Sequence, residues 1–198
     1  DPDALSRRRA ALEETMGALV DLHREGKIRA VGVSNFSKHE VAQSAKYLGS
    51  VPLAAAQTEY SLIARNAEKE LFDDCLSQGR ALLACSVLGQ GALAYLRSVP
   101  TDSRRWAAQF VFSNRAKIMR VIERVMVPIA ERHQATVAQV ATAWVLAHED
   151  VTAAIIGASG HRQALENVTA IDVVLSREDV HELGDAFDRA GIDPLASN

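Results

Sequence analysis

The 198-residue sequence lacks the features typical of disulfide-rich, metal-binding, nucleic-acid-binding and membrane proteins. Its two cysteines, Cys75 and Cys85, are too few for a disulfide framework and lack the spacing of a metal site. A net charge of −3 gives no basic excess of the kind that nucleic-acid-binding proteins carry. No apolar run approaches the ~20 residues of a membrane helix, and the first residues lack the features of a secretory signal. We therefore expect a cytoplasmic protein with no metal site, no nucleic-acid partner and no membrane contact.

The composition and length predict one globular domain. With 48% hydrophobic residues, the chain can bury a sizeable core. Neither a linker nor a low-complexity tract interrupts the sequence, so we expect a single domain over residues 1–198.

Apolar periodicity alternates between helix and strand along the chain. Strands are predicted over residues 28–34, 53–60, 81–87 and 152–157. Helices are predicted over residues 8–25, 37–48, 67–78, 118–129, 137–145 and 161–170, with a last helix after Ser176. Capping boxes begin at Ser37 and Thr136, and Pro128 predicts a kink. Residues 88–115 break the pattern and are expected to form a lid-like loop.

Alternating strands and helices predict a parallel sheet with right-handed crossovers. A doubly wound sheet and an α/β barrel both fit this rhythm. Two observations favour the barrel: the sequence has no Gly-x-Gly-x-x-Gly fingerprint, and all four strands end in polar or glycine residues. Such barrels keep their chemistry at the carboxyl ends of the strands.

The strand-end segments VGVSNF (31–36), AAQTEYSL (55–62), LACSVLGQG (83–91) and AIIGAS (154–159) occur in one order, with QVATAW (139–144) before the last. In this order they resemble the C-terminal half of an aldo-keto reductase. The resemblance implies an α/β fold of TIM-barrel-type units, with about half of an eight-stranded barrel, strands 5 to 8, in this chain. It also implies an oxidoreductase that uses NADPH to reduce the carbonyl group of an aldehyde or ketone.

The resemblance assigns cofactor-binding roles residue by residue. It places the nicotinamide carboxamide on Ser34, Asn35 and Gln57, whose hydroxyl and amide groups suit its one acceptor and two donors. The position that stacks on the nicotinamide ring is Cys85, and the segment around the diphosphate contains Ser86, Leu88 and Gln90. The residues that the resemblance assigns to binding the adenosine end of the cofactor are Ala158, Ser159, Gln163, Glu166 and Asn167. Simple strand-end turns at 34–35 and 86–90 remain alternatives.

The sequence departs from the family pattern at three places. Cys85 replaces an aromatic ring, Val87 replaces a proline, and Gly157 stands where many members place a lysine for the ribose phosphate. His161 and Arg162 are nearby groups that could serve this phosphate, although Arg162 is displaced by one residue from the usual basic position. We therefore expect weak or no NADPH binding by this chain alone, with the adenosine side contributing most of what remains.

No catalytic residue can be assigned. The family's tyrosine, lysine, aspartate and histidine lie on its first four strands, and none of them has a counterpart here. One interpretation is an oxidoreductase whose N-terminal half is absent from this chain. The alternative is a half-barrel without redox activity that serves binding, assembly or non-redox catalysis and pairs with itself. The expected partners are accordingly a small carbonyl substrate and either the missing half or a second copy of the chain.

Overall fold

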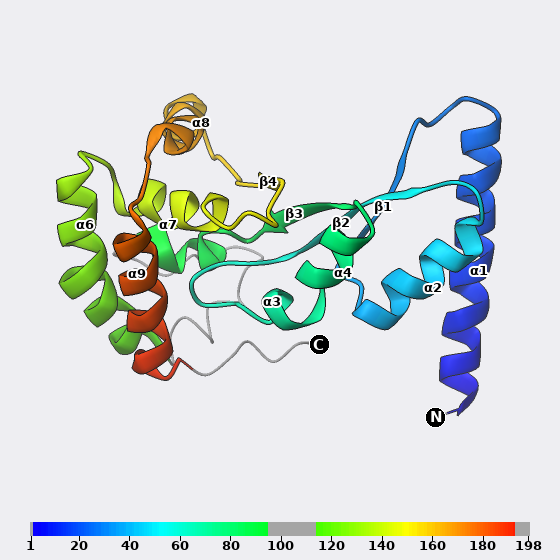
Figure 1. Cartoon of the computed structure of the whole chain (residues 1–198), viewed down its shortest axis with the longest axis horizontal. Coiled ribbons are helices and arrows are strands. Elements are labelled where there is room, and N and C mark those ends of the chain that lie inside the picture. Colours follow the sequence, from blue (N-terminus) through cyan, green and yellow to red (C-terminus); the bar gives the residue numbers. More distant parts are fainter. Residues whose placement is uncertain (1, 95–113, 193–198) are drawn as a thin grey trace. The chain divides into compact units, whose positions relative to one another are not determined.

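The computed structural model describes residues 2–94 and 114–192 of an α/β chain (Figure 1). Four strands form one sheet in the order β1 (Val31–Ser34), β2 (Leu53–Glu59), β3 (Ala81–Cys85) and β4 (Ala153–Ala154). β1 and β2 are parallel. The described chain divides into two compact units. The first contains the residues up to Thr58 together with Glu68–Leu83, and the second contains Glu59–Ala67 and the residues from Ala84 onward.

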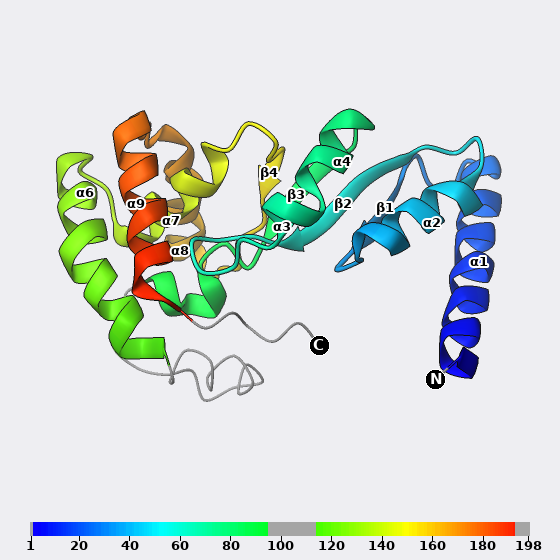
Figure 2. The same ribbon diagram turned by 60° about the horizontal axis from the view of Figure 1, so that its bottom comes forward.

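Helices α1 (Pro2–Arg24) and α2 (Lys38–Leu48) pack against each other in the first unit, and both views show them side by side (Figures 1 and 2). The predicted capping box is present, with the Ser37 hydroxyl accepting from the Glu40 amide and the Glu40 carboxylate accepting from the Ser37 amide. Gly26 after α1 has a φ of 71°, as expected for a glycine that closes a helix. Apolar side chains such as Met16 and Val41 are buried here.

The register of β1 and β2 brings two predicted site residues opposite each other. β1 alternates buried Val31 and Val33 with exposed Gly32 and Ser34. A side chain on Gly32 would place its Cβ 3.2 Å from the carbonyl oxygen of Ala55 on β2, so the close approach of these strands favours glycine. The pairing continues to the strand end, where Ser34 lies opposite Gln57.

The second unit is mainly helical. It contains η1 (Gly89–Ala94), helical residues 114–121, the π-helical turn η2 (Ile122–Met126), α6 (Val127–Arg132), α7 (Val137–Leu146), α8 (His161–Val168), η3 (Thr169–Asp172) and α9 (Arg177–Ala190). Helices α6, α7 and α9 lie together in both views (Figures 1 and 2). The irregularity predicted from Pro128 takes the form of the π turn, after which the proline occupies the first turn of α6, where its missing N–H is tolerated.

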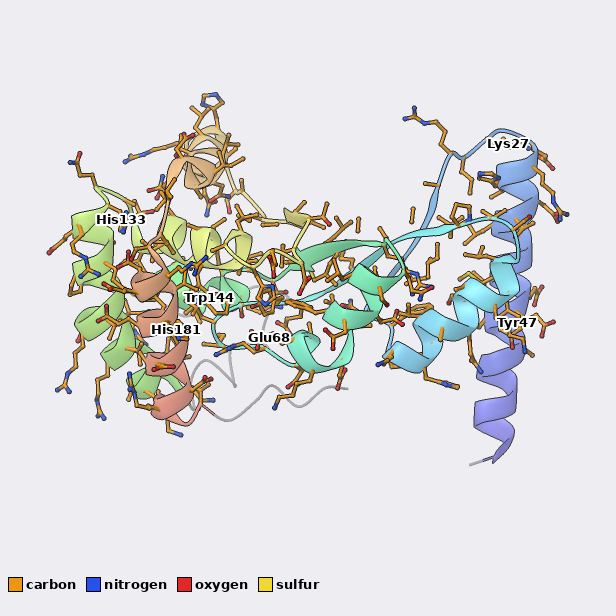
Figure 3. The ribbon with its side chains drawn as sticks, viewed as in Figure 1. Lys27, Tyr47, Glu68, His133, Trp144 and His181 are labelled. Carbon is orange, nitrogen blue, oxygen red and sulfur yellow. The ribbon has the colours of Figure 1, made fainter. Side chains whose placement is uncertain are left out.

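Tyr60 and Trp144 are the large aromatic residues of the second unit's core. Tyr60 is fully buried, and its ring centroid lies 5.5 Å from that of Trp144. The indole Nε1 of Trp144 donates to the carbonyl of Val180 at 3.0 Å, which joins α7 to α9 (Figure 3). The guanidinium of Arg65 lies 5.4 Å from the Trp144 ring centroid and pairs with Asp188 at 2.9 Å.

Several boundaries differ from the sequence predictions. The first helix begins at Pro2 rather than at residue 8, and the helix predicted over 67–78 is broken at Leu71 into α3 (Ala67–Glu70) and α4 (Phe72–Ser77). Leu71 and Phe72 are both buried, so the break turns adjacent apolar side chains inward. The strand predicted over 152–157 forms regular pairing only at Ala153–Ala154. Most of the predicted lid-like loop, residues 95–113, lies outside the described residues.

Candidate functional site

Ser34, Asn35 and Gln57 meet at the carboxyl ends of β1 and β2. The Nε2 of Gln57 donates to the Ser34 hydroxyl at 3.1 Å, and the backbone N–H of Asn35 donates to the Gln57 carbonyl at 2.8 Å. Asn35 has a φ of 57°, a left-handed conformation that asparagine tolerates better than most residues and that ends the strand. The strand register explains this cluster, because it places Ser34 directly opposite Gln57.

A second cluster follows β3, where the chain turns through a run of left-handed residues. Ser86, Gly89, Gln90 and Gly91 have φ values of 53°, 54°, 58° and 98°. The Nε2 of Gln90 donates to the Ser86 hydroxyl at 3.2 Å, and the N–H of Gly89 donates to the Ser86 carbonyl at 2.7 Å. Left-handed residues are common in turns that bind phosphate through backbone N–H groups, whereas the N–H groups of Gly89 and Gly91 are bonded here to carbonyls of the same turn.

Glycine is required at position 89 of this turn. Its φ is left-handed, and an added Cβ would lie 2.3 Å from the Cδ1 of Ile63. Two more predicted site residues, one before the turn and one within it, accept backbone hydrogen bonds. The Cys85 carbonyl accepts from the Tyr60 N–H at 3.1 Å, and the Leu88 carbonyl accepts from the N–H groups of Gly91 and Leu93 at 3.0 Å. The backbone around the proposed diphosphate segment is thus held on both sides.

A third cluster links the chain after β4 to α8. The Ser159 N–H donates to the side chain of Gln163 at 2.7 Å, and the Nδ2 of Asn167 donates to the Gly157 carbonyl at 3.2 Å. Ala158, Ser159 and Gln163 are exposed, whereas Glu166 and Asn167 are half-buried. The five residues predicted for the adenosine end therefore belong to one locally hydrogen-bonded segment.

Gln139 positions this segment, a role that was not predicted from the sequence. Gln139 closes the capping box of α7, and its Nε2 also donates to the Glu166 carbonyl at 3.2 Å and to the Thr169 hydroxyl at 2.8 Å. Its place three residues after Thr136 identified the cap, but no local pattern indicates contact with a helix so far along the chain.

Glu59 is a second group that the sequence analysis did not single out. It lies two residues after Gln57 on β2, so its side chain points to the same face of the strand. Its Oε1 is buried and has no hydrogen-bond partner among the described residues, and burial raises the pKa of this carboxyl.

Over residues 2–94 and 114–192, no group of histidine, cysteine, aspartate and glutamate side chains is arranged to hold a metal ion. None of the described helices is long and apolar enough to cross a membrane.

Comparison with known proteins decides the family. The model of the Aldo/keto reductase family matches residues 1–187. The chain belongs to the aldo/keto reductase family. The resemblance inferred from the strand-end segments is thereby confirmed, and the α/β sheet is similar to those of aldo/keto reductase barrels.

Curated relatives of this aldo/keto reductase chain are about twice as long. It is 32% identical over 184 residues to the NADH-specific methylglyoxal reductase of Escherichia coli K12, which covers 90% of this chain and 55% of that protein. It is 33% identical over 171 residues to the glyoxal reductase of Bacillus subtilis, covering 86% of this chain and 50% of the relative. The chain thus spans about half the length of these relatives.

The chain also matches about half of the length of two solved structures. The glycerol dehydrogenase of Gluconobacter oxydans matches with a TM-score of 0.74 and 27% identity, covering 94% of this chain and 57% of that one. A thermostable aldo-keto reductase in complex with the inhibitor epalrestat matches with a TM-score of 0.67 and 27% identity, covering 88% of this chain and 54% of the other.

Proposed function

We propose that this aldo/keto reductase chain supplies the cofactor-binding strand ends of an NAD(P)H-dependent oxidoreductase that reduces an aldehyde or ketone. In this proposal Ser34, Asn35 and Gln57 bind the nicotinamide carboxamide. Cys85 occupies the position that faces the nicotinamide ring, and the turn with Ser86, Leu88 and Gln90 binds the diphosphate. The segment from Ala158 to Asn167, with Ser159, Gln163 and Glu166, binds the adenosine end. The bound cofactor supplies the hydride.

The hydrogen-bonded pair of Ser34 and Gln57 carries the proposal. Gln57 donates one N–H to the Ser34 oxygen, which leaves the serine O–H as a donor and the Gln57 Oε1 as an acceptor. A carboxamide presents the complementary groups, one C=O acceptor and an NH₂ donor. Two side chains held at a fixed distance on neighbouring strands would determine which face of the nicotinamide ring points at the substrate.

The diphosphate and adenosine roles come from the resemblance to the family, and local geometry supports them. The turn from Ser86 to Gly91 contains left-handed residues of the kind found in phosphate-binding turns, and Gly89 fits it without steric conflict. At the other segment, Asn167 ties the chain at Gly157 to α8, and Gln139 fixes the end of that helix.

We propose NADPH as the cofactor, with Arg162 at the start of α8 as the cation for the ribose phosphate. Arg162 is exposed and lies one residue beyond His161, where α8 begins. The NADH-specific name of one relative makes the choice between the cofactors a direct test. Replacement of Arg162 by glutamine should weaken NADPH binding more than NADH binding, and equal losses would contradict the assignment.

We assign no proton donor within these 198 residues. Our proposal places the catalytic groups on a further half of the barrel, which would close against the strand positions that this chain leaves open. Gly32 and Ser34 on β1 are exposed, and Ile155 just after β4 has 44% of its surface exposed. The sequential strand order, without the reversal of a doubly wound sheet, supports a half-barrel.

A second function is supported by the same exposed positions. A half-barrel without a proton donor can cover them by pairing with a second copy and act in binding, assembly or non-redox catalysis. The single domain over residues 1–198 and the cytoplasmic location remain predictions under both proposals.

The two functions are separated by measuring size and turnover together. Light scattering of the 198-residue chain, combined with an NADPH oxidation assay on small aldehydes, is expected to show no turnover without a complementing half. A dimer without turnover and without NADPH binding supports the self-paired half-barrel. A monodisperse monomer that reduces aldehydes contradicts both proposals.

Calorimetric titration tests the nicotinamide contact itself. Gln57→Leu should weaken NADPH binding about five- to tenfold, because one hydrogen-bonding group of the carboxamide loses its partner. Gln78→Leu is the matched control, since Gln78 is exposed at the end of α4 and outside the proposed site. Equal affinity in the Gln57 variant and the wild-type chain would remove the nicotinamide assignment.

A further inference from the structure

Four cations line one groove in the second unit, away from the residues assigned to the cofactor. The groove lies between the helix that contains residues 114–121, with its continuation into η2, and helix α9. Its volume is about 340 Å³, which falls in the range of small-molecule sites. The cations are Lys117, Arg120, Arg124 and Arg189.

Arg120 and Arg124 are one helical turn apart on the same helix face. Like charges at this spacing repel and weaken a helix. Over residues 114–192, neither guanidinium forms an ion pair. The chain as a whole carries a net charge of −3, so this gathering of positive charge is not a general property of its surface.

The other two cations are held at the edge of the groove. Lys117 Nζ donates to the Gly191 carbonyl at 2.6 Å, which fixes the ammonium group beside the end of α9. Arg189 lies 3.9 Å from Asp185 on the same helix, a long contact between exposed groups that neutralises little of its charge.

The remaining lining of the groove is apolar. Val121 is buried and Val125 half-buried on one side, and the small side chains of Ala186 and Ala190 leave room on the other. A ligand for this groove therefore needs both an anionic group for the guanidinium groups and an apolar body for the space beside the valines.

We propose that this groove binds a small phosphate-bearing ligand with an apolar body. Arginine guanidinium groups present paired N–H donors that match phosphoryl oxygens, and two of them with a lysine can surround one phosphate. The site is separate from the proposed function: none of its residues belongs to the three cofactor clusters.

The test is calorimetric titration of the 198-residue chain at low ionic strength with phenyl phosphate and with inorganic phosphate. Phenyl phosphate is expected to bind more tightly, since its ring adds apolar contact. The double variant R120Q/R124Q should bind phenyl phosphate at least about tenfold more weakly, because two charge-assisted contacts are lost. R177Q is the matched control, an exposed arginine at the opposite end of α9.

Amide NMR shifts locate the ligand, and thermal melting shows whether the double variant stays folded. Shifts confined to residues 117–125 and 186–191 support the proposal. Shifts confined to residues 157–167 assign the phosphate to the cofactor segment and overturn it. Unchanged affinity in folded R120Q/R124Q also overturns it. Far tighter binding of single-stranded RNA than of phenyl phosphate would replace the small ligand with a nucleic acid.

Discussion

Replacement of Asp179 by asparagine is expected to destabilise the second unit by about 2 kcal/mol. Asp179 is buried at the start of α9, where its carboxylate accepts from the Ser176 N–H at 3.0 Å and from the Ser176 hydroxyl at 2.7 Å. The carboxylate also accepts from Arg132 at 2.5 Å and lies 2.9 Å from the Nε2 of His133, at the end of α6. One carboxylate thus caps α9 and joins it to α6.

The expected destabilisation follows from which hydrogen bonds of the Asp179 side chain asparagine can still form. Its side-chain oxygen can still accept from Ser176, so most of the capping interaction survives. The charge-assisted contact with half-buried His133 is lost, and such contacts are worth about 1.5–3 kcal/mol. Arg132 is 53% exposed, so solvent screens its contact and the expected loss comes mainly from His133.

The effect of pH provides a stricter test. Burial alone raises the pKa of Asp179, but the hydrogen bonds from Ser176, His133 and Arg132 outweigh burial and hold the pKa well below its usual range. A carboxyl with a lowered folded-state pKa stabilises fully above its unfolded pKa of about 3.9 and loses that contribution as pH falls toward the folded value. The difference in unfolding free energy between wild type and D179N should therefore not narrow from pH 7 to 5, and it should narrow below about pH 4.

The assay is urea unfolding followed by tryptophan fluorescence. In a Trp106→Phe background Trp144 is the single tryptophan, and its contact with Val180 reports on α9 directly. A difference in unfolding free energy near zero at pH 7, or one that already narrows between pH 7 and 5, would contradict the role given to the Asp179 carboxylate.

Three other predictions concern the scaffold of the site. Gly89→Ala should destabilise the chain by about 1–3 kcal/mol in thermal melts, because position 89 has a left-handed φ and the added Cβ would meet Ile63; an unchanged melting temperature would contradict this. Gln139→Ala should speed amide exchange in α8 while leaving α2 unchanged, because Gln139 anchors Glu166; equal exchange in α8 would argue against that anchor. Arg80→Met should cost about 1–3 kcal/mol by denaturant titration, since it leaves the largely buried Asp74 without its 2.6 Å partner; no cost would show that solvent replaces the pair.

Local patterns predicted the elements of this fold well where the signal lies within a few residues. The Ser37 and Thr136 capping boxes and the cap at Ser176 are all present, because reciprocal hydrogen bonds over three residues depend little on the rest of the chain. The break at Leu71 could not be predicted in this way. It follows from burying both Leu71 and Phe72, which depends on packing rather than on helix propensity.

In the candidate site too, some contacts could be predicted from the sequence and others could not. Strand ends in one parallel sheet were expected to meet, and the contact between Gln57 and Ser34 is present. The resemblance supplied the cofactor roles, which the geometry alone does not assign. Two features could not be predicted, because they depend on the packing of segments far apart in the sequence. They are the hydrogen bonds from Gln139 to Glu166 and Thr169, and the burial of the Glu59 Oε1.

The most direct test of the central claim is an NMR titration of the ¹⁵N-labelled chain with NADPH. We predict saturable, weak binding that shifts the amides of Ser34, Asn35 and Gln57 together with those of residues 86–91 and 157–167. We also predict that the adenosine segment still responds to an adenosine phosphate lacking nicotinamide, whereas Ser34 and Gln57 do not. Absence of shifts in all three clusters at millimolar NADPH, or shifts confined to other parts of the chain, would contradict the claim that these strand ends form a nicotinamide-cofactor site.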